Sequence, residues 1–246
     1  MKSPYTAIAA VTLLLAGCAT TDEHAYTTPM HTIDEVEVPA GGFPSDIHDP
    51  LESFNRGVYA FNARFDDYVF LPALHVYETV MPDVLEDRVS DFFSNLREIP
   101  NFVNSVLQLN LNHAGRAAHR FFVNSTIGLL GFIDIATLTG YPQEAEDFGQ
   151  TLGVWGAGEG PNIVLPIFGP SNLRDTSGLA VSAIATGMAV PTDVQDTTAY
   201  DAAAYGLRPV DVRRNTAFRY YSSSSPFEYE LVRLLYTQKR QFDIQR

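Results

Sequence analysis

The sequence contains a single cysteine, Cys18, and is short of positive charge, with 16 Lys and Arg against 29 Asp and Glu among its 246 residues. One cysteine leaves no partner for a disulfide within the chain, so its thiol is free, joined to another molecule or modified. The formal net charge of −13 argues against a nucleic-acid partner, which needs clustered Lys and Arg to neutralise phosphates. The same shortage argues against electrostatic binding to anionic lipid. Any contact with a membrane would therefore have to be hydrophobic.

The sequence also lacks the motifs that mark common catalytic and cofactor sites. It has no G-x-S-x-G, H-E-x-x-H, C-x-x-C or P-loop pattern. Glycines recur from Gly153 to Gly160, but not as G-x-G-x-x-G, and Pro161 stands where a nucleotide-binding helix would open. His113 and His119 are six residues apart, which places them on different faces of a helix. We therefore predict a protein that is not an enzyme and that holds no cofactor and no metal.

The N-terminus has the pattern of a secretory signal. Lys2 precedes an apolar stretch from Ala7 to Leu15 that is too short to span a bilayer as a helix. The tetrad LAGC that ends at Cys18 resembles the bacterial lipobox, in which the signal is cleaved before a cysteine that then becomes acylated. We therefore predict a lipoprotein signal peptide at residues 1–17 and lipid attachment at Cys18, with a free thiol or an intermolecular bridge as the alternative. By analogy with lipoprotein sorting in enteric bacteria, Ala19 favours the outer membrane as the destination.

Two regions follow the predicted lipidation site. Residues 18–48 are polar and acidic, with no helical or strand period, and are predicted to form a tether. Residues 49–246 are predicted to form a mainly α domain. Its first helix is expected to have Asp49 as its N-cap and to end at Pro72, and prolines 82 and 100 are expected at later helix junctions. The apolar residues of this first helix recur at spacings of three and four and share one face: Phe54, Val58, Phe61, Phe65 and Tyr68.

Further helices are predicted wherever apolar residues keep the helical period. Each is bounded by Pro, Gly or polar residues, so the domain should consist of several amphipathic helices joined by short connections. These helices cover roughly residues 73–80, 82–96, 100–109, 111–127, 171–188, 200–207 and 227–242.

The segment Phe148–Asn172, FGQTLGVWGAGEGPNIVLPIFGPSN, is apolar but interrupted by Gly or Pro every few positions. It is too apolar for a solvated loop and too interrupted for a long helix or a central strand. Irregular apolar backbone of this kind fits either a packed loop in a soluble domain or the wall of a water-filled cavity at membrane depth. We therefore expect Gly- and Pro-rich apolar segments to connect the helices.

The helix predicted over residues 111–127 carries a polar stripe. His113, Arg116, Arg120 and Asn124 are three, four and four residues apart, so they project from one side of the helix. One interpretation is a solvated basic face. The other is the wall of a wet passage for anionic head groups, because the planar fork of Arg gives two hydrogen bonds to a phosphate.

Several long motifs follow one another behind the lipobox and extend over nearly the whole of residues 49–240. They are DPLESFNR from Asp49, DRVSDFFSNL from Asp87, RFFVNSTIGLLGFIDIA from Arg120, EDFGQTLGVWGAGEGPNIVLPIFGPSNLRD from Glu146 and YTQKR from Tyr236. Together these motifs resemble the MlaA (VacJ) family of outer-membrane lipoproteins. Arg120 and Asn124 fall on the third motif, so we rank these two residues above His113 and Arg116 as members of a passage.

The resemblance implies a ring of helices in the inner leaflet of the outer membrane of a Gram-negative bacterium, lipid-anchored and facing the periplasm. It implies association with a trimeric outer-membrane porin. The implied function is the removal of mislocalised phospholipids from the outer leaflet through a polar passage, and their transfer to a soluble periplasmic phospholipid-binding carrier. Two alternatives remain at this point: a structural lipoprotein that scaffolds porins or the cell wall without transport, and a lipid hydrolase with an unfamiliar site.

Overall fold

The computed structural model describes residues 47–223 and 225–246. The predicted signal peptide at residues 1–17, the predicted lipid attachment at Cys18 and all but the last two residues of the tether at 18–48 lie outside the described part. Within the described part the fold is mainly α, with one two-stranded antiparallel sheet. The predicted fold class is confirmed.

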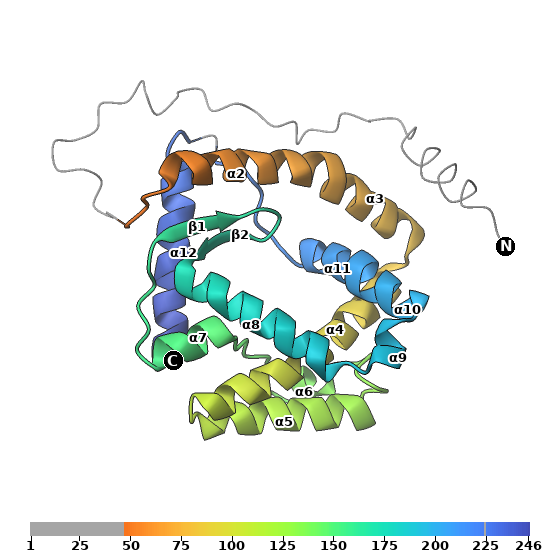
Figure 1. Ribbon diagram of the computed structural model, residues 1–246. Helices are drawn as coiled ribbons and strands as arrows, with labels where there is room; N and C mark the ends of the chain where they lie inside the picture. The colour runs from red at the N-terminus through yellow and green to blue at the C-terminus, as the bar shows by residue number, and fades with distance from the viewer. Residues whose placement is uncertain (1–46, 224) are drawn as a thin grey trace.

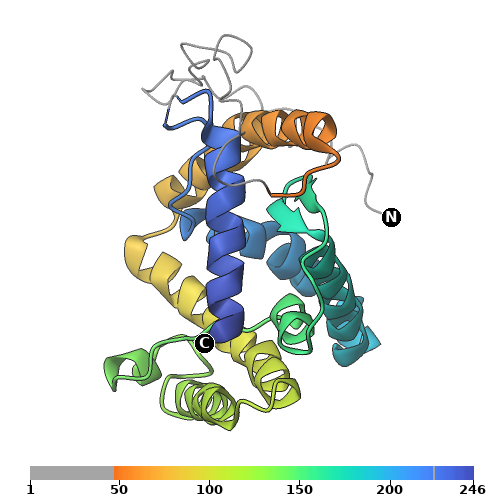
Figure 2. The same cartoon turned by 90° about the vertical axis from the view of Figure 1, so that its left-hand side faces the viewer.

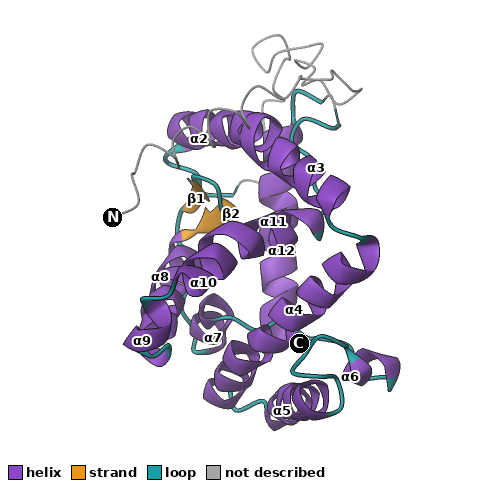
Figure 3. Ribbon diagram, turned by 90° about the vertical axis from the view of Figure 1, so that its right-hand side faces the viewer, coloured by secondary structure: helices purple, strands orange, loops and turns teal. Residues whose placement is uncertain are grey.

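The helices follow one another around the molecule in a ring-like arrangement (Figure 1). In this view α2 (Glu52–Phe65) and α3 (Leu71–Val80) run along the top, and α12 (Glu228–Gln245) runs down the left side. The helix α5 (Leu111–Thr126) lies along the bottom, and α8 (Leu173–Ala189) crosses the front. Views from either side place α8 on one side of the molecule and α3 and α4 on the other, with α12 between them (Figure 2, Figure 3).

The predicted helices are present, although α4 joins two of them and several ends differ. The helix α5 begins at the predicted residue, because the Asn110 side chain caps it by accepting a hydrogen bond from the His113 amide at 3.2 Å. Four short helices, α6, α7, α9 and α11, were not predicted. The remaining elements in chain order are the π-helical turn η2 (Asp66–Phe70), α4 (Asp83–Leu107), α6 (Ile135–Leu138), α7 (Phe148–Val154), β1 (Asn162–Leu165), β2 (Gly169–Asn172), α9 (Thr192–Gln195), α10 (Thr198–Asp201), the π-helical turn η3 (Ala202–Leu207) and α11 (Arg208–Arg214).

Pro72 does not end the first helix, as the sequence led us to expect. The π-helical turn η2 comes just before it, and the Leu71 amide there bonds to the Asp66 carbonyl, five residues earlier. This wider turn shifts the hydrogen-bond register just before Pro72, which has no backbone N–H to donate. The helix α2 therefore runs through η2 into α3 without a break.

Pro100 lies inside α4, where we expected a junction between two helices. A proline in a helix interior removes one backbone hydrogen bond and costs about 3 kcal/mol. Side-chain contacts on both sides of it offset this cost. Before the proline, Asn95 donates to Ser125 of α5, and after it, Asn104 accepts from Thr151 of α7. The helix α4 stays continuous because neighbouring helices hold both of its halves.

Asp49 does not cap α2, which is also a change from the prediction. The N-cap position is Leu51, and it makes no side-chain capping bond. The Asp49 carboxylate instead accepts hydrogen bonds from Asn55 at 2.7 Å, Tyr229 at 2.5 Å and Arg233 at 3.0 Å. Because Tyr229 and Arg233 belong to α12, this carboxylate joins the first and last helices of the described chain.

The segment Phe148–Asn172 is more regular than its glycines and prolines suggested. It begins with α7 and ends with the antiparallel hairpin of β1 and β2. The side chain of Asn55 pairs with β1 as a third strand would, accepting from the Val164 amide at 2.9 Å and donating to the Asn162 carbonyl at 3.1 Å. Asn62, two turns later on α2, makes a similar pair of bonds with the Leu165 carbonyl and the Ile167 amide. The amide side chains of α2 thus satisfy backbone N–H and C=O groups of β1 and the following turn that no third strand of the described chain pairs with.

Candidate functional site

The described residues are divided between interior and surface in the opposite way from a water-soluble protein. Twenty-three polar or charged residues are buried, against nine hydrophobic ones. Forty large hydrophobic side chains are exposed. Charged residues are rarely buried in soluble proteins unless they are paired, and soluble monomers seldom expose large apolar surfaces. Polar contacts therefore hold the inside of this fold together while apolar side chains face outward.

The first helix shows this inversion clearly. Its predicted apolar face forms, but Phe54 is 61% exposed and Phe61 is 48% exposed. The buried side of α2 consists mainly of polar or hydroxyl-bearing residues, among them Asn55, Tyr59 and Asn62. The same holds for α4, whose buried residues are mostly Asn, Glu and Ser. Within the described part of the chain, no helix is both long enough and apolar enough to cross a membrane.

Arg120, which we ranked first in the polar stripe, is 1% exposed. Its guanidinium donates to Glu98 of α4, to Asp134 at 3.0 Å, to Thr137 at 2.9 Å and to the backbone carbonyl of Tyr141. These partners come from α4, α6 and the segments that flank α6. The interpretation as a solvated face is wrong for this residue, because protein groups surround its charge.

Asn124 is buried to the same degree and shares a partner with Arg120. Its amide donates to Asp134 at 3.0 Å and accepts from the Ala136 amide at 2.9 Å. Burial alone would raise the pKa of Asp134, but hydrogen bonds from Thr137, Arg120 and Asn124 outweigh it, so the pKa lies below its ordinary value. Asp134 is therefore an anion that joins the end of α5 to the start of α6.

The other two stripe residues, His113 and Arg116, line a polar hollow of about 720 Å³ at the start of α5. The two ring nitrogens of His113 each face a carboxylate, with Nδ1 2.8 Å from Glu146 and Nε2 3.2 Å from Glu144. The Arg116 side chain is 48% exposed and lies 2.7 Å from Glu144. The stripe is thus divided into an accessible half and a buried half. The remaining residues that line the hollow are Asn110, Leu111, Asn112, Gly115, His119, Tyr141 and Arg246.

A second polar cluster joins α7, α8 and α12. Arg240 of α12 donates to Asp147 at 2.7 Å and 2.9 Å and to Asp175 at 2.8 Å and 3.0 Å. Burial alone would lower the pKa of Arg240, but these hydrogen bonds outweigh it and raise the pKa above its ordinary value. Asp175 also accepts from Tyr236 at 2.7 Å. The cluster gives the YTQKR motif a structural role at the side of the ring.

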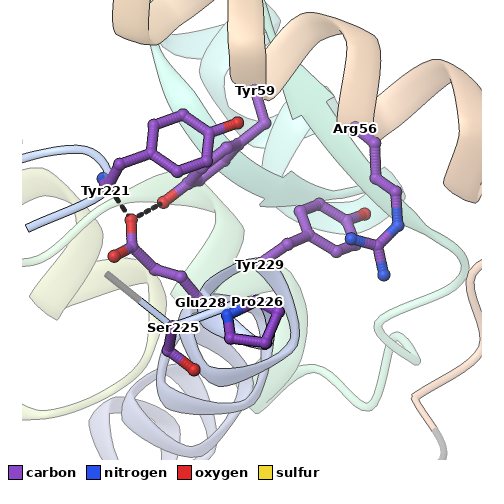
Figure 4. A pocket seen from close by; sticks show the side chains of 7 residues that line it. All are labelled: Arg56, Tyr59, Tyr221, Ser225, Pro226, Glu228 and Tyr229. Carbon is purple, nitrogen blue, oxygen red and sulfur yellow. Dashed lines mark hydrogen bonds between the residues drawn. The ribbon is translucent and has the colours of Figure 1, made fainter. Parts of the chain in front are cut away.

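A small cavity of about 60 Å³ lies between α2 and the start of α12 (Figure 4). Glu228 accepts from the Tyr59 hydroxyl at 2.8 Å and from the Tyr221 amide, and these two bonds are drawn in the figure. The Arg56 guanidinium lies 4.5 Å from the centre of the Tyr229 ring. The cavity can hold a few waters but not a lipid head group. Sequence reasoning missed it because its residues come from segments more than 160 positions apart, so no local spacing marks them.

No group of three or more His, Cys, Asp or Glu in the described part of the chain is arranged to hold a metal ion. The lipid-attachment residue predicted from the sequence, Cys18, lies outside that part. Of the four stripe residues, Arg120 and Asn124 are buried together, whereas His113 and Arg116 line the hollow.

The chain is similar in sequence and structure to proteins of one family. The family described as MlaA lipoprotein matches residues 47–243. The Escherichia coli (strain K12) protein named intermembrane phospholipid transport system lipoprotein MlaA is 34% identical over 182 residues, which cover 72% of this chain and 65% of that protein. An uncharacterised protein of Rickettsia prowazekii, RP093, is 36% identical over 137 residues, which cover 56% of this chain and 55% of that protein. The chain thus spans about half the length of this relative.

One solved structure is also similar. It is described as "Structural basis for maintenance of bacterial outer membrane lipid asymmetry" and aligns with a TM-score of 0.62 at 28% sequence identity. The alignment covers 80% of this chain and 98% of that chain. The fold described above is therefore similar to that solved structure over most of the described residues.

Proposed function

The chain belongs to the MlaA lipoprotein family, and on this premise we propose that it removes mislocalised phospholipids from the outer leaflet of the outer membrane. In this proposal it passes them to a soluble periplasmic carrier and so maintains the lipid asymmetry of that membrane. The names of its relatives and the description of the similar solved structure support this function.

The observation that carries the proposal is the inverted distribution of polar and apolar side chains. A surface with forty exposed large hydrophobic residues is unfavourable in water and favourable against hydrocarbon. Protein groups satisfy the buried charge of Arg120, whose guanidinium has four partners. A protein of this kind is suited to lie in a lipid leaflet and to offer a polar route through it.

Four residues in three turns add a second supporting observation. Leu109, Leu129, Leu130 and Ile167 have positive φ angles of 59°, 53°, 61° and 71°, which costs non-glycine residues about 1–3 kcal/mol each. All four side chains are nevertheless exposed, Leu109 to 84% and Leu130 to 72%. Burying such a side chain in hydrocarbon is worth about 1.5–3 kcal/mol, which offsets the strain. These turns are therefore suited to insert into the leaflet.

We place the route for the head group along the accessible half of the stripe. Arg116 and His113 line the 720 Å³ hollow, and the planar guanidinium of Arg116 suits a phosphate. In this proposal Arg120 and Asn124 stabilise the wall of the route and do not contact the head group, because their side chains are already hydrogen-bonded to Asp134 and other protein groups.

The anchor and the partners belong to the proposal as well. Cleavage after residue 17 and acylation of Cys18 would fix the chain to the inner leaflet, facing the periplasm, and a trimeric porin would be its neighbour in the membrane. Three acyl chains anchor far more firmly than one, which gives only marginal binding. The mass of the mature N-terminus tests this part, since an unmodified Cys18 would contradict it.

The transport proposal is tested by measuring outer-leaflet phospholipid in cells that lack the protein. Complementation by the wild type should restore the normal low level, whereas Arg116→Glu should restore it only partly because like charges repel the phosphate. Arg97→Glu is the control, since Arg97 is an exposed arginine on α4 away from the hollow.

Two assays separate this function from its alternatives. A structural lipoprotein would leave the phospholipid level unchanged when it is deleted, and the purified protein would carry no phospholipid. A hydrolase would release fatty acid from phospholipid vesicles, whereas the proposed transport makes and breaks no covalent bond.

A further inference from the structure

Three buried polar oxygens without a hydrogen-bond partner lie where α3, α4 and α11 meet. They are the hydroxyl of Tyr77 on α3, Oε1 of Glu86 on α4 and Oδ2 of Asp211 on α11. Glu86 is 3% exposed and Asp211 is 1% exposed. Burial raises the pKa of Tyr77, and the negative charges of Glu86 and Asp211 raise it further, while Arg214 lowers it. Two contacts join α4 to α11 at this point, from Arg214 to Glu86 and from Ser90 to Asp211. Because Glu86 and Ser90 are four residues apart on α4, and Asp211 and Arg214 three apart on α11, the two carboxylates lie on the facing sides of these helices.

Arg214 is the cation of this cluster, and its charge is already used. Its Nε lies 2.8 Å from Oε2 of Glu86, and its Nη2 lies 3.1 Å from Oδ1 of Asp87. Oε1 of Glu86 remains buried without a hydrogen-bond donor. Arg214 is therefore already paired with two carboxylates, those of Glu86 and Asp87.

Asp211 has no cationic partner among the described residues. Its Oδ1 accepts from the Ser90 hydroxyl and, at 3.2 Å, from the Asn215 amide. The adjacent cation on α11, Arg213, pairs with Asp66 instead. An ionised carboxylate that is buried without a cation is costly, and proteins relieve this cost by pairing the charge or by coordinating a metal.

We propose that this cluster binds a hard divalent cation, Mg²⁺ or Ca²⁺, through Oε1 of Glu86 and Oδ2 of Asp211, with the Tyr77 hydroxyl beside it. Carboxylate and hydroxyl oxygens favour Mg²⁺ and Ca²⁺ over softer metals. Mg²⁺ is commonly held by only one or two carboxylates together with several waters, so a pair of carboxylates suffices. The ion would neutralise the negative charge that Arg214 does not compensate, and it would link α11 to α3 and α4. The site is independent of the proposed transport function.

Thermal unfolding of the full-length protein in detergent tests the site. After treatment with EDTA, addition of millimolar Mg²⁺ or Ca²⁺ should raise the unfolding midpoint of the wild type by several degrees, because a ligand that binds only the folded state stabilises it. Asp211→Asn and Glu86→Gln should lose this rise. Asp201→Asn should keep it, since Asp201 is an exposed acid on α10 that controls for weak binding to the acidic surface.

Terbium luminescence provides the second measurement. Tb³⁺ bound at the site should be sensitised by tyrosine and displaced by Ca²⁺ in the wild type and in Asp201→Asn, but not in Asp211→Asn. Tyr77→Phe should weaken the luminescence and keep the Ca²⁺-dependent stability.

The absence of any cation effect on the wild type would overturn the proposal. An equal effect in Asp211→Asn or Glu86→Gln would overturn it too, because the ion would then bind elsewhere. If Asp211→Asn does not fold, Glu86→Gln and the Tb³⁺ titration of the wild type decide by the same criteria.

Discussion

Single residues of the polar stripe differ in what their substitution should do, because Arg120 is buried and Arg116 is not. Arg120→Glu would place a third carboxylate beside Glu98 and Asp134, and removing one partner of a buried ion pair costs about 3–5 kcal/mol. We expect this variant to unfold at a much lower temperature than the wild type in detergent. Arg116→Glu is the control, and its half-exposed side chain should change stability by no more than about 0.5 kcal/mol. Equal midpoints for the wild type and Arg120→Glu would contradict the structural role of Arg120.

The acid stability of the fold depends on single carboxylates, of which Asp175 is the best defined. Burial alone would raise the pKa of Asp175, but hydrogen bonds from Arg240, Arg174 and Tyr236 outweigh it and lower the pKa below the model-peptide value of 3.8. A depressed pKa means that the carboxylate contributes stability above the unfolded-state pKa and loses it as the pH falls toward the folded-state pKa. We therefore expect the unfolding midpoint to fall steeply once the pH drops below about 4.

Asp175→Asn tests the assignment of this acid transition. It should be less stable than the wild type at neutral pH, where the charge is present, and its midpoint should depend less on pH below that range. Asp193→Asn, at an exposed position on α9, should keep the pH dependence of the wild type. An unchanged acid transition in Asp175→Asn would assign that transition to other carboxylates.

The sequence predicted the helical elements well because their signals are local. The apolar period located α5 to within a residue at either end. Pro100 misled us because the contacts that keep α4 straight come from α5 and α7. Apolar spacing also identified the face of α2 that carries Phe54, but spacing does not reveal whether that face meets a core or a lipid. The partners of Arg120 lie 14 to 22 positions away, so no helical period could identify them.

The crossing of α7 and α8 is an element-scale feature with a sharp requirement for glycine. A Cβ on Gly178 of α8 would come within 2.4 Å of the Gly149 backbone nitrogen on α7. Gly178→Ala should therefore force the two helices apart and destabilise the protein by about 1–3 kcal/mol, as overpacking does. Thermal unfolding would measure this loss.

Gly187→Ala is the matched control in the same helix, because nothing lies within 4 Å of the position of its Cβ. Alanine there should stabilise α8 by about 0.5–1 kcal/mol through its better helix propensity. Opposite signs for the two substitutions would confirm that the α7–α8 crossing requires a glycine. A stabilising effect of Gly178→Ala would mean that the helices can separate without cost.

The whole molecule is held together by polar side chains that connect distant parts of the chain. Asp49 joins α2 to α12, Asp66 joins η2 to Arg213 of α11, and Arg240 joins α12 to α7 and α8. Hydrogen bonds of this kind do not need water outside the protein, so the fold can stay intact with an apolar exterior. The proposed lipid anchor and the apolar surface would then be two separate means of attachment to a membrane.

Cleavage of the chain between Ala19 and His48 separates these two means. The core that begins near residue 49 should stay with the membrane after proteolysis, and high salt should not release it, because salt screens charges but does not weaken the burial of apolar surface. The measurement is the fraction of core found in the pellet after sedimentation. Because a porin could also retain the core, the same cleavage should be performed in porin-free liposomes. Full release of the core from those liposomes would show that acyl chains alone held the protein, and the forty exposed hydrophobic side chains would then require a protein partner rather than lipid.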